Sequence, residues 1–154
     1  GLGDVYKRQV MLKRTVADQW FSDCVRQRIN YTCERCGTEY PDPSKRMGLH
    51  CSHYFSRANY SVRFHPDNAF CLCLGCHQYL GSNPHDHKEF VKFKLGTARY
   101  NKLLQTRNDI ELGRHMRKRK KQIAAHYRKE YRAMEKERET CGNTGYLTFD
   151  CYSE

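Results

Sequence analysis

The sequence predicts an α+β fold that is mainly helical: a small zinc-bound core of two strands and a helix, preceded by one helix and followed by a long basic helical segment. Three observations predict it. Four of the nine cysteines form two Cys-x-x-Cys pairs. Apolar residues make up only 38% of the 154 residues, so a metal staple suits this chain better than a large core. Lys and Arg outnumber Asp and Glu by 28 to 17, with a dense basic run towards the C-terminus.

The first ten residues are expected to lie outside the fold. They lack a start methionine, and Asp4 to Gln9, when back-translated, resembles a transposon end used to prepare sequencing libraries. We interpret residues 1–10 as a sequencing artefact and Met11 as the native start, with a genuine N-terminal tail as the alternative. The remaining chain divides into a zinc-stapled domain with its N-terminal helix, a basic helical extension and an irregular tail: 11–96, 97–140 and 141–154.

The first expected element is a helix over residues 15–30. Thr15 is its candidate N-cap, and Trp20 is one of several apolar residues at helical spacing. A tight turn of the kind that binds metals follows over 33–37, and then a proline-containing loop over 40–44. The chain thus enters its metal-binding core directly from a helix.

A hairpin and two helices are expected next. Short strands are predicted over 49–55 and 69–72, joined by a polar loop over 56–67. A helix then runs from residue 74 to a terminal glycine at 81. Another begins with a proline in its first turn and covers 84–96.

The basic segment is predicted to form one helix over residues 109–139. Residues 114–138 contain 11 Lys and Arg against three Glu. Four apolar residues recur at helical spacing: Ile123, Tyr127, Tyr131 and Met134. Five consecutive basic residues are the candidate DNA contacts: Arg117, Lys118, Arg119, Lys120 and Lys121. We expect the apolar stripe to pack on the body or on a second copy as a homodimer, and the basic face to follow phosphates without reading bases.

Net charge and hydropathy limit the classes of binding partner that this protein is expected to have. A net charge of +11 favours a polyanion such as DNA, although ribosomal or membrane-surface attachment would produce the same surplus. No apolar stretch approaches the ~20 residues that span a bilayer, and no signal-peptide pattern is present. We therefore expect a soluble, cytoplasmic protein without a membrane partner. In a reducing compartment, Cys-x-x-Cys pairs favour metal binding over disulfides.

The two cysteine pairs predict a structural zinc site. Its ligands are Cys33, Cys36, Cys73 and Cys76. A two-residue spacer lets both thiolates of a pair face one ion, and four thiolates leave no coordination position for a substrate. Any chemistry must therefore come from other residues.

A histidine, an asparagine and a second histidine lie in register with these pairs. The segments are Leu-His-Cys-Ser-His-Tyr-Phe-Ser-Arg at 49–57 and His-Pro-Asp-Asn at 65–68, with a histidine directly after the second pair at 77. This order resembles the HNH endonucleases over residues 31–81, and implies their ββα-metal core. Residues 49–53, 61–68 and 75–84, with Trp20-Phe21, more closely resemble the phage NinG (Rap) recombination proteins. That resemblance implies metal-dependent cleavage of branched DNA during phage recombination, in the bacterial host cytoplasm.

Chemical roles follow from the residue types. His53 is the candidate general base, because a neutral imidazole can accept a proton near pH 7. His77 is the candidate ligand of a catalytic divalent ion, for which Mg²⁺ or Mn²⁺ is favoured and Zn²⁺ is the alternative. Asn68 is expected to hold the loop by side-chain to backbone hydrogen bonds, which would orient His53. Arg57 and Arg63 are candidate phosphate contacts. This mechanism requires His53 and His77 to flank one phosphate.

The ligand set departs from the HNH pattern at two places. Ser52 precedes the candidate base where many of these enzymes have an acid or histidine, and Gly81 stands where a second helix histidine is usual. His50 is a tentative replacement, although strand alternation puts it on the face opposite His53 unless the strand bulges. His85 and His87 are further candidates.

Two other readings use the same features. A non-catalytic, zinc-bound nucleic-acid-binding module would keep the cysteine pairs and the basic helix, with the histidines as bystanders. A zinc-organised protein adaptor would use the helical tail and show no salt-dependent affinity for DNA.

Overall fold

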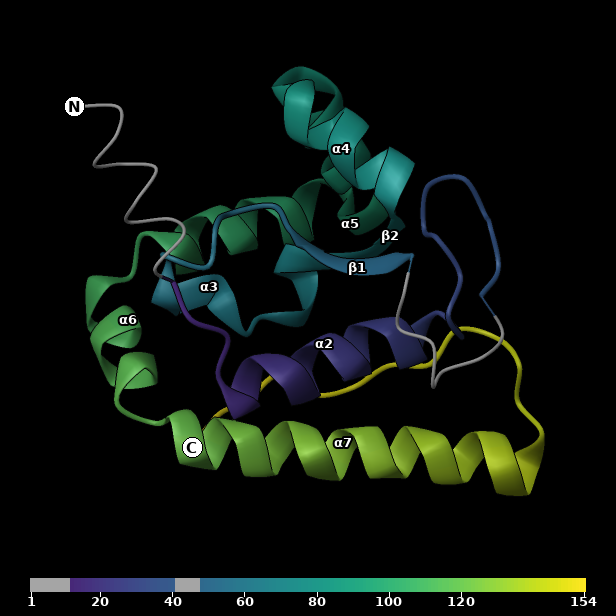
Figure 1. The fold of residues 1–154 in the computed structure, drawn as a ribbon. Coiled ribbons are helices and arrows are strands. Elements are labelled where there is room, and N and C mark those ends of the chain that lie inside the picture. Colours follow the sequence, from purple (N-terminus) through teal and green to yellow (C-terminus); the bar gives the residue numbers. More distant parts are fainter. Residues whose placement is uncertain (1–11, 41–47) are drawn as a thin grey trace.

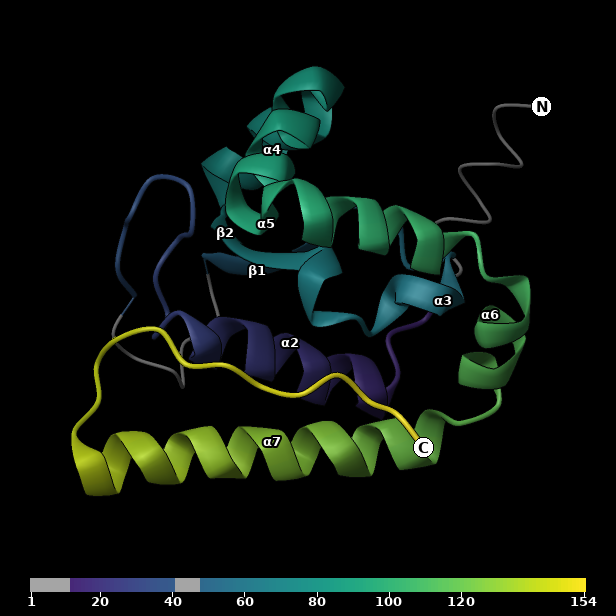
Figure 2. The same cartoon turned by 180° about the vertical axis from the view of Figure 1, so that it is seen from behind.

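The computed structural model describes residues 12–40 and 48–154, so the expectations for residues 1–10 and for most of the 40–44 loop lie outside the described residues. The elements stack in layers (Figure 1), with the long helix α7 at one side, α2 next to it, then a two-stranded hairpin, and α4 and α5 on the far side. From behind, the C-terminal tail runs along α2 and α7 (Figure 2). The chain is mainly helical with one small sheet, as predicted.

Helix α2 (Val16–Arg28) and helix α7 (Lys120–Cys141) form the principal helix pair. The Thr15 side chain accepts from the Asp18 backbone N–H, and the Asp18 carboxylate accepts from the Thr15 backbone N–H, which completes a capping box. Phe21 packs edge-on against Tyr127, and both are fully buried. The predicted apolar stripe of α7 is confirmed, and it packs on the body of the same chain. A homodimer through this helix stays a prediction that would have to use its outer face.

The hairpin pairs β1 (Leu49–His53) with β2 (Ala69–Cys73) in antiparallel register, from Leu49 opposite Cys73 to His53 opposite Ala69. The connection contains a short helix, α3 (Tyr60–Arg63), and a 3₁₀ turn, η1 (Pro66–Asn68). The prediction of an irregular loop here was wrong. The segment is polar overall, but Val62 and Phe64 within it are fully buried. Their packing stabilises short helical turns that the periodicity of the sequence does not indicate.

Helix α4 (Leu74–Ser82) begins directly after β2, and α5 (Pro84–Arg107) follows it. The helix predicted over 84–96 is confirmed as far as a break at Gly96, but the prediction missed the second helical stretch, which continues to Arg107. Gly96 has φ 78° and ψ 165°, which breaks the helix locally, but the chain resumes helical geometry. Tyr100 and Leu103 are buried beyond the break, so tertiary packing holds this second half of α5.

The predicted single basic helix is divided into α6 (Ile110–Arg117) and α7 by a turn at Lys118 and Arg119. The turn lets α6 pack on α3 while α7 packs on α2. Beyond α7 the tail is irregular, as predicted, yet it buries Leu147 and Phe149. None of the helices in the two described ranges combines the length and apolar character needed to cross a membrane.

Candidate metal and catalytic site

Two backbone turns bring four cysteines together at the end of the hairpin. The Sγ atoms of Cys33, Cys36, Cys73 and Cys76 all lie within 4.8 Å of one another. The pairs come from the turn after α2 and from the junction of β2 with α4. In the described part of the chain, no other group of three or more His, Cys, Asp or Glu residues comes this close together. The predicted set of four thiols therefore has the arrangement needed to bind a metal ion such as zinc.

Hydrogen-bond donors surround these thiols, although burial raises the pKa of Cys76 to about 12. The backbone N–H of Cys36 donates to Cys33 Sγ and that of Cys76 to Cys73 Sγ, both at 3.5 Å. Arg35 donates to Cys76 Sγ, also at 3.5 Å. Hydrogen bonds from Thr38 lower the pKa of Cys36 to about 6. Donors to sulfur stabilise the charged form that binds a metal, so the residues present fit a structural zinc.

His50 and His77 meet on the face of the hairpin that α4 covers. Their Nδ1 atoms lie 3.0 Å apart, and the rings are nearly perpendicular. Helix α4 presents His77 in its first turn, one residue after Cys76, so the cysteine cluster also fixes its position. Burial, and then His50, lowers the pKa of His77, which keeps the ring neutral and able to bind a cation. No bulge is needed for His50 to reach His77, because the strand pairing is regular.

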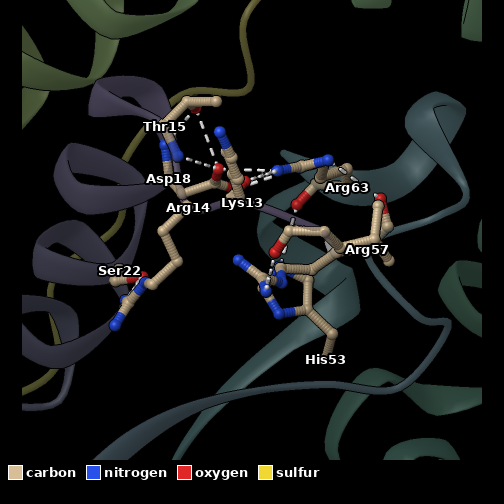
Figure 3. A network of polar contacts seen from close by, with 9 residues as sticks. Lys13, Arg14, Thr15, Asp18, Ser22, His53, Arg57 and Arg63 are labelled. Atoms are coloured by element: carbon tan, nitrogen blue, oxygen red, sulfur yellow. Dashed lines mark hydrogen bonds and ion pairs between the residues drawn. The ribbon is translucent and has the colours of Figure 1, made fainter. Parts of the chain in front are cut away.

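His53 lies apart from that pair. It is three positions from His50 on a regular strand, so it faces α2, where its ring lies 5.8 Å from that of Phe21. Its Nε2 lies 2.9 Å from the Arg63 carbonyl oxygen (Figure 3). A carbonyl can only accept, so Nε2 carries the proton and Nδ1 keeps the lone pair. Burial lowers the pKa of His53 to about 4. The ring is therefore neutral, with a fixed tautomer, at pH 7.

Asn68 fixes the backbone segment that contains the carbonyl bound by His53. Its side chain is fully buried; Oδ1 accepts from Phe55 N–H at 2.8 Å, and Nδ2 donates to the carbonyls of Phe55 and Val62 at 3.0 and 3.1 Å. The Val62 carbonyl is one residue before the carbonyl that binds His53. These are the side-chain to backbone hydrogen bonds expected of Asn68.

Arg63 is part of the interior, contrary to the expectation that it contacts phosphate. Its side chain is 1% exposed and forms a bidentate ion pair with Asp18, with N–O distances of 3.0 and 2.7 Å. Figure 3 shows this pair joining α2 to the connection between the strands. Burial alone would raise the pKa of Asp18, but hydrogen bonds from Arg63 and Thr15 outweigh it and lower that pKa. Arg63 thus anchors the carbonyl that fixes His53.

A cavity of about 400 Å³ is lined by side chains from α2, β1 and α4. His50 and His77 border it, as does Arg57, whose guanidinium is half-buried. Arg14, Gln19 and Arg26 also line it, and sequence reasoning missed all three. Gln19 and Arg26 share one face of α2, so a polar helix face towards the hairpin was the available signal.

The five basic residues 117–121 lie at the turn between α6 and α7. Arg117, Lys118 and Lys121 are exposed. Arg119 forms an ion pair with Glu154 at 3.1 Å. Arg117 and Lys120 lie over the ring of Tyr60, at 5.6 and 5.5 Å from its centroid. The run is thus a cluster at one corner of the molecule rather than a stripe along one helix.

The other two candidate histidines lie on α5. His85 is exposed. His87 packs edge-on against Tyr54, with ring centroids 5.0 Å apart, and burial, and then His77, lowers its pKa. Its Nε2 is buried without a hydrogen-bond partner in the described part of the protein. His87 is therefore the better placed of the two to act as a further ligand.

Comparison with known proteins places the chain in a protein family. No curated protein and no solved structure gives a match. One protein family does, and its description is Bacteriophage Lambda NinG protein. The match extends over residues 6–137, which includes α2, the cysteine cluster, the hairpin with its histidines and most of α7. The chain therefore belongs to the NinG protein family.

Proposed function

We propose that this protein is a metal-dependent endonuclease of the HNH kind that hydrolyses phosphodiester bonds in branched DNA during phage recombination. The observation that carries the proposal is the meeting of His50 and His77 at a cavity lined with guanidinium groups, beside a hairpin that fixes the tautomer of His53. Family membership, the net charge of +11 and the basic corner at 117–121 support a DNA substrate.

The structural zinc would be held by the four cysteines, and a second divalent ion by His50 and His77. A bound divalent ion polarises a phosphate oxygen and lowers the pKa of water. Two neutral imidazoles favour Mn²⁺ or Zn²⁺ over Mg²⁺, which prefers oxygen ligands. The proposed ion is therefore Mn²⁺ or Zn²⁺ in preference to Mg²⁺. His87, whose Nε2 is buried without a hydrogen-bond partner among the described residues, is the proposed third ligand.

The structure does not meet the requirement that His53 and His77 flank one phosphate, because His53 faces α2 and is absent from the lining of the cavity that His50 and His77 border. We nevertheless assign the role of general base to His53, through Nδ1. Because Nε2 donates to the Arg63 carbonyl, Nδ1 has the lone pair that accepts the proton of the attacking water. The Asp18–Arg63 ion pair and Asn68 hold that carbonyl in place. Both are positioning groups, and neither touches substrate in this mechanism.

The test is cleavage of forks, junctions and linear duplexes by the zinc-loaded protein, with Mg²⁺, Mn²⁺ or Zn²⁺ added. His53→Ala should lower the cleavage rate at least ~100-fold, the usual contribution of a general base, while DNA affinity stays unchanged. His85→Ala, an exposed histidine outside the cavity, is the matched control and should cleave normally. An undiminished rate in His53→Ala would reject this base.

One observation favours the alternative of a non-catalytic, zinc-bound nucleic-acid-binding module. In the described residues only the cysteine cluster gathers three or more metal ligands, and His53 faces away from the His50–His77 pair. The same assay separates the two functions. Tight binding of forks without products under any of the three ions would support the non-catalytic module.

A further inference from the structure

Three arginines from different parts of the chain converge on the cavity beside the histidine pair. Arg14 precedes α2, Arg26 lies within it, and Arg57 follows β1. The described residues that line this cavity include no carboxylate. A cavity bordered by three guanidinium groups, of which only that of Arg26 is paired with a carboxylate in the described part of the chain, is therefore electropositive, and it lies against the site proposed for a catalytic ion.

The hydrogen bonds of these arginines leave donors to spare. Arg14 donates to the neutral hydroxyl of Ser22 at 2.9 Å, and Arg57 to the Leu12 carbonyl at 3.0 Å. Arg26 is 3% exposed and pairs with Asp23 at 2.9 Å through Nη2. Its Nε is buried and has no partner among the described residues. A buried donor without a partner is costly, which points to a ligand that supplies the acceptor.

The charges also interact unfavourably with one another. Burial lowers the pKa of Arg57, and Arg63 and Arg14 lower it further, against the opposing effect of Asp18. Arg26 and Arg14 also counteract the rise that burial causes in the pKa of Cys51 on the cavity wall, so both positive charges act on this cavity. Cations held this close together are stabilised by an anion between them.

We propose that Arg14, Arg26 and Arg57 form an anion site that binds one phosphate of a nucleic-acid strand next to the His50–His77 pair. Guanidinium groups match the two non-bridging oxygens of a phosphodiester, and their fixed donors position it. The site deepens the proposed function, on which it rests, by naming the residues that hold the substrate. A phosphodiester within a strand and a phosphate at its 5′ end both present non-bridging oxygens to guanidinium groups, and the test below tells them apart.

The test measures binding of a fluorescent DNA fork by the zinc-loaded protein without a second divalent ion, so that cleavage does not interfere. Arg14→Gln and Arg57→Gln should each weaken binding about tenfold and reduce the slope of log affinity against log salt by about one. Lys136→Gln removes the same charge from the exposed surface of α7 and should change affinity less than about twofold. Arg26 is left unaltered because its buried ion pair supports the fold.

A second measurement identifies the phosphate. Forks that each carry one neutral methylphosphonate, and a fork with or without a 5′-terminal phosphate, are bound by the unaltered protein and by Arg57→Gln. At the phosphate that Arg57 contacts, the neutral substitution should weaken the unaltered protein and have little further effect on the variant. The position of this coupling tells an internal phosphodiester from a terminal phosphate.

The outcomes separate this proposal from the nuclease. One outcome is that both arginine variants lose affinity with unchanged melting curves and circular dichroism, and yet show no coupling at any methylphosphonate position. That result would overturn direct contact of these arginines with one phosphate. Losses equal to that of Lys136→Gln would overturn the site, even if the protein cleaves DNA through His53. Coupling at one phosphate in a protein that cleaves nothing would establish the anion site and reject the nuclease.

Discussion

At the scale of single residues, the pKa of His53 determines how stability responds to acid. Its pKa is about 4 in the folded protein and near 6.5 when the ring is exposed. Between these values the unfolded chain binds the proton and the folded chain does not, so stability falls as pH decreases through this window. A shift of this size corresponds to as much as ~3 kcal/mol. His53→Gln should therefore lose less stability than the unaltered protein between pH 6.5 and 4.5.

Urea denaturation at intervals across that window measures the effect. Loss of zinc at low pH affects every variant equally, so the difference between variants is the informative quantity. His85→Gln, at an exposed position, should follow the unaltered protein. Parallel curves for His53→Gln and the unaltered protein would show that the His53 ring is not held neutral by burial.

The buried ion pair between Asp18 and Arg63 is the second residue-scale determinant. Asp18→Asn leaves the Arg63 guanidinium charged inside the protein without a carboxylate, and breaking a buried pair in this way costs about 3 kcal/mol or more. Urea denaturation at pH 7 should show that loss. The exposed pair of Glu111 with Arg114 provides the control, since Glu111→Gln should change stability far less. Equal effects of the two substitutions would contradict a structural role for Asp18.

At the scale of elements, the sequence predicted the helices and strands that local signals such as caps and cysteine pairs mark. It missed those whose limits depend on contacts between distant parts of the chain. Capping residues located the start of α2, and the two cysteine pairs located the hairpin and α4. The division between α6 and α7 has no proline or glycine to mark it; it depends on α6 packing against α3, far away in the sequence. Arg57 was a candidate from the sequence, but Arg14 and Arg26 were missed for the same reason, because distant segments bring them to the cavity.

The break in α5 gives an element-scale prediction. Gly96 adopts φ 78° and ψ 165°, a conformation that is essentially restricted to glycine, so Gly96→Ala should destabilise the protein by about 1–3 kcal/mol. Gly81 lies within helical α4, where an added methyl group would meet no atom within 4 Å. Gly81→Ala should therefore stabilise the protein by about 0.5–1 kcal/mol. Thermal melting of both variants tests this contrast, and a loss of stability in Gly81→Ala comparable to that in Gly96→Ala would refute it.

At the scale of the whole molecule, one hydrophobic cluster contains buried residues from Ala17 to Phe149. The basic helical extension and the tail therefore pack on the same core as the hairpin. Cys33 and Cys76 belong to this cluster as well as to the metal site. Metal binding and folding should consequently be coupled throughout the chain, and loss of the ion should affect more than the hairpin.

Removal of one zinc ligand tests that coupling. Cys36 and Cys141 are both exposed thiols, but only Cys36 belongs to the cluster. Cys36→Ser should lose bound zinc and several kcal/mol of stability, which for a chain of this size lowers Tm by about 10 °C. Cys141→Ser should keep one zinc per chain and an unchanged Tm. Metal analysis with circular dichroism during heating measures both quantities. A single transition that moves as a whole in Cys36→Ser supports one cooperative core, whereas a second transition at the original temperature would mean that α2 and α7 fold without the metal site.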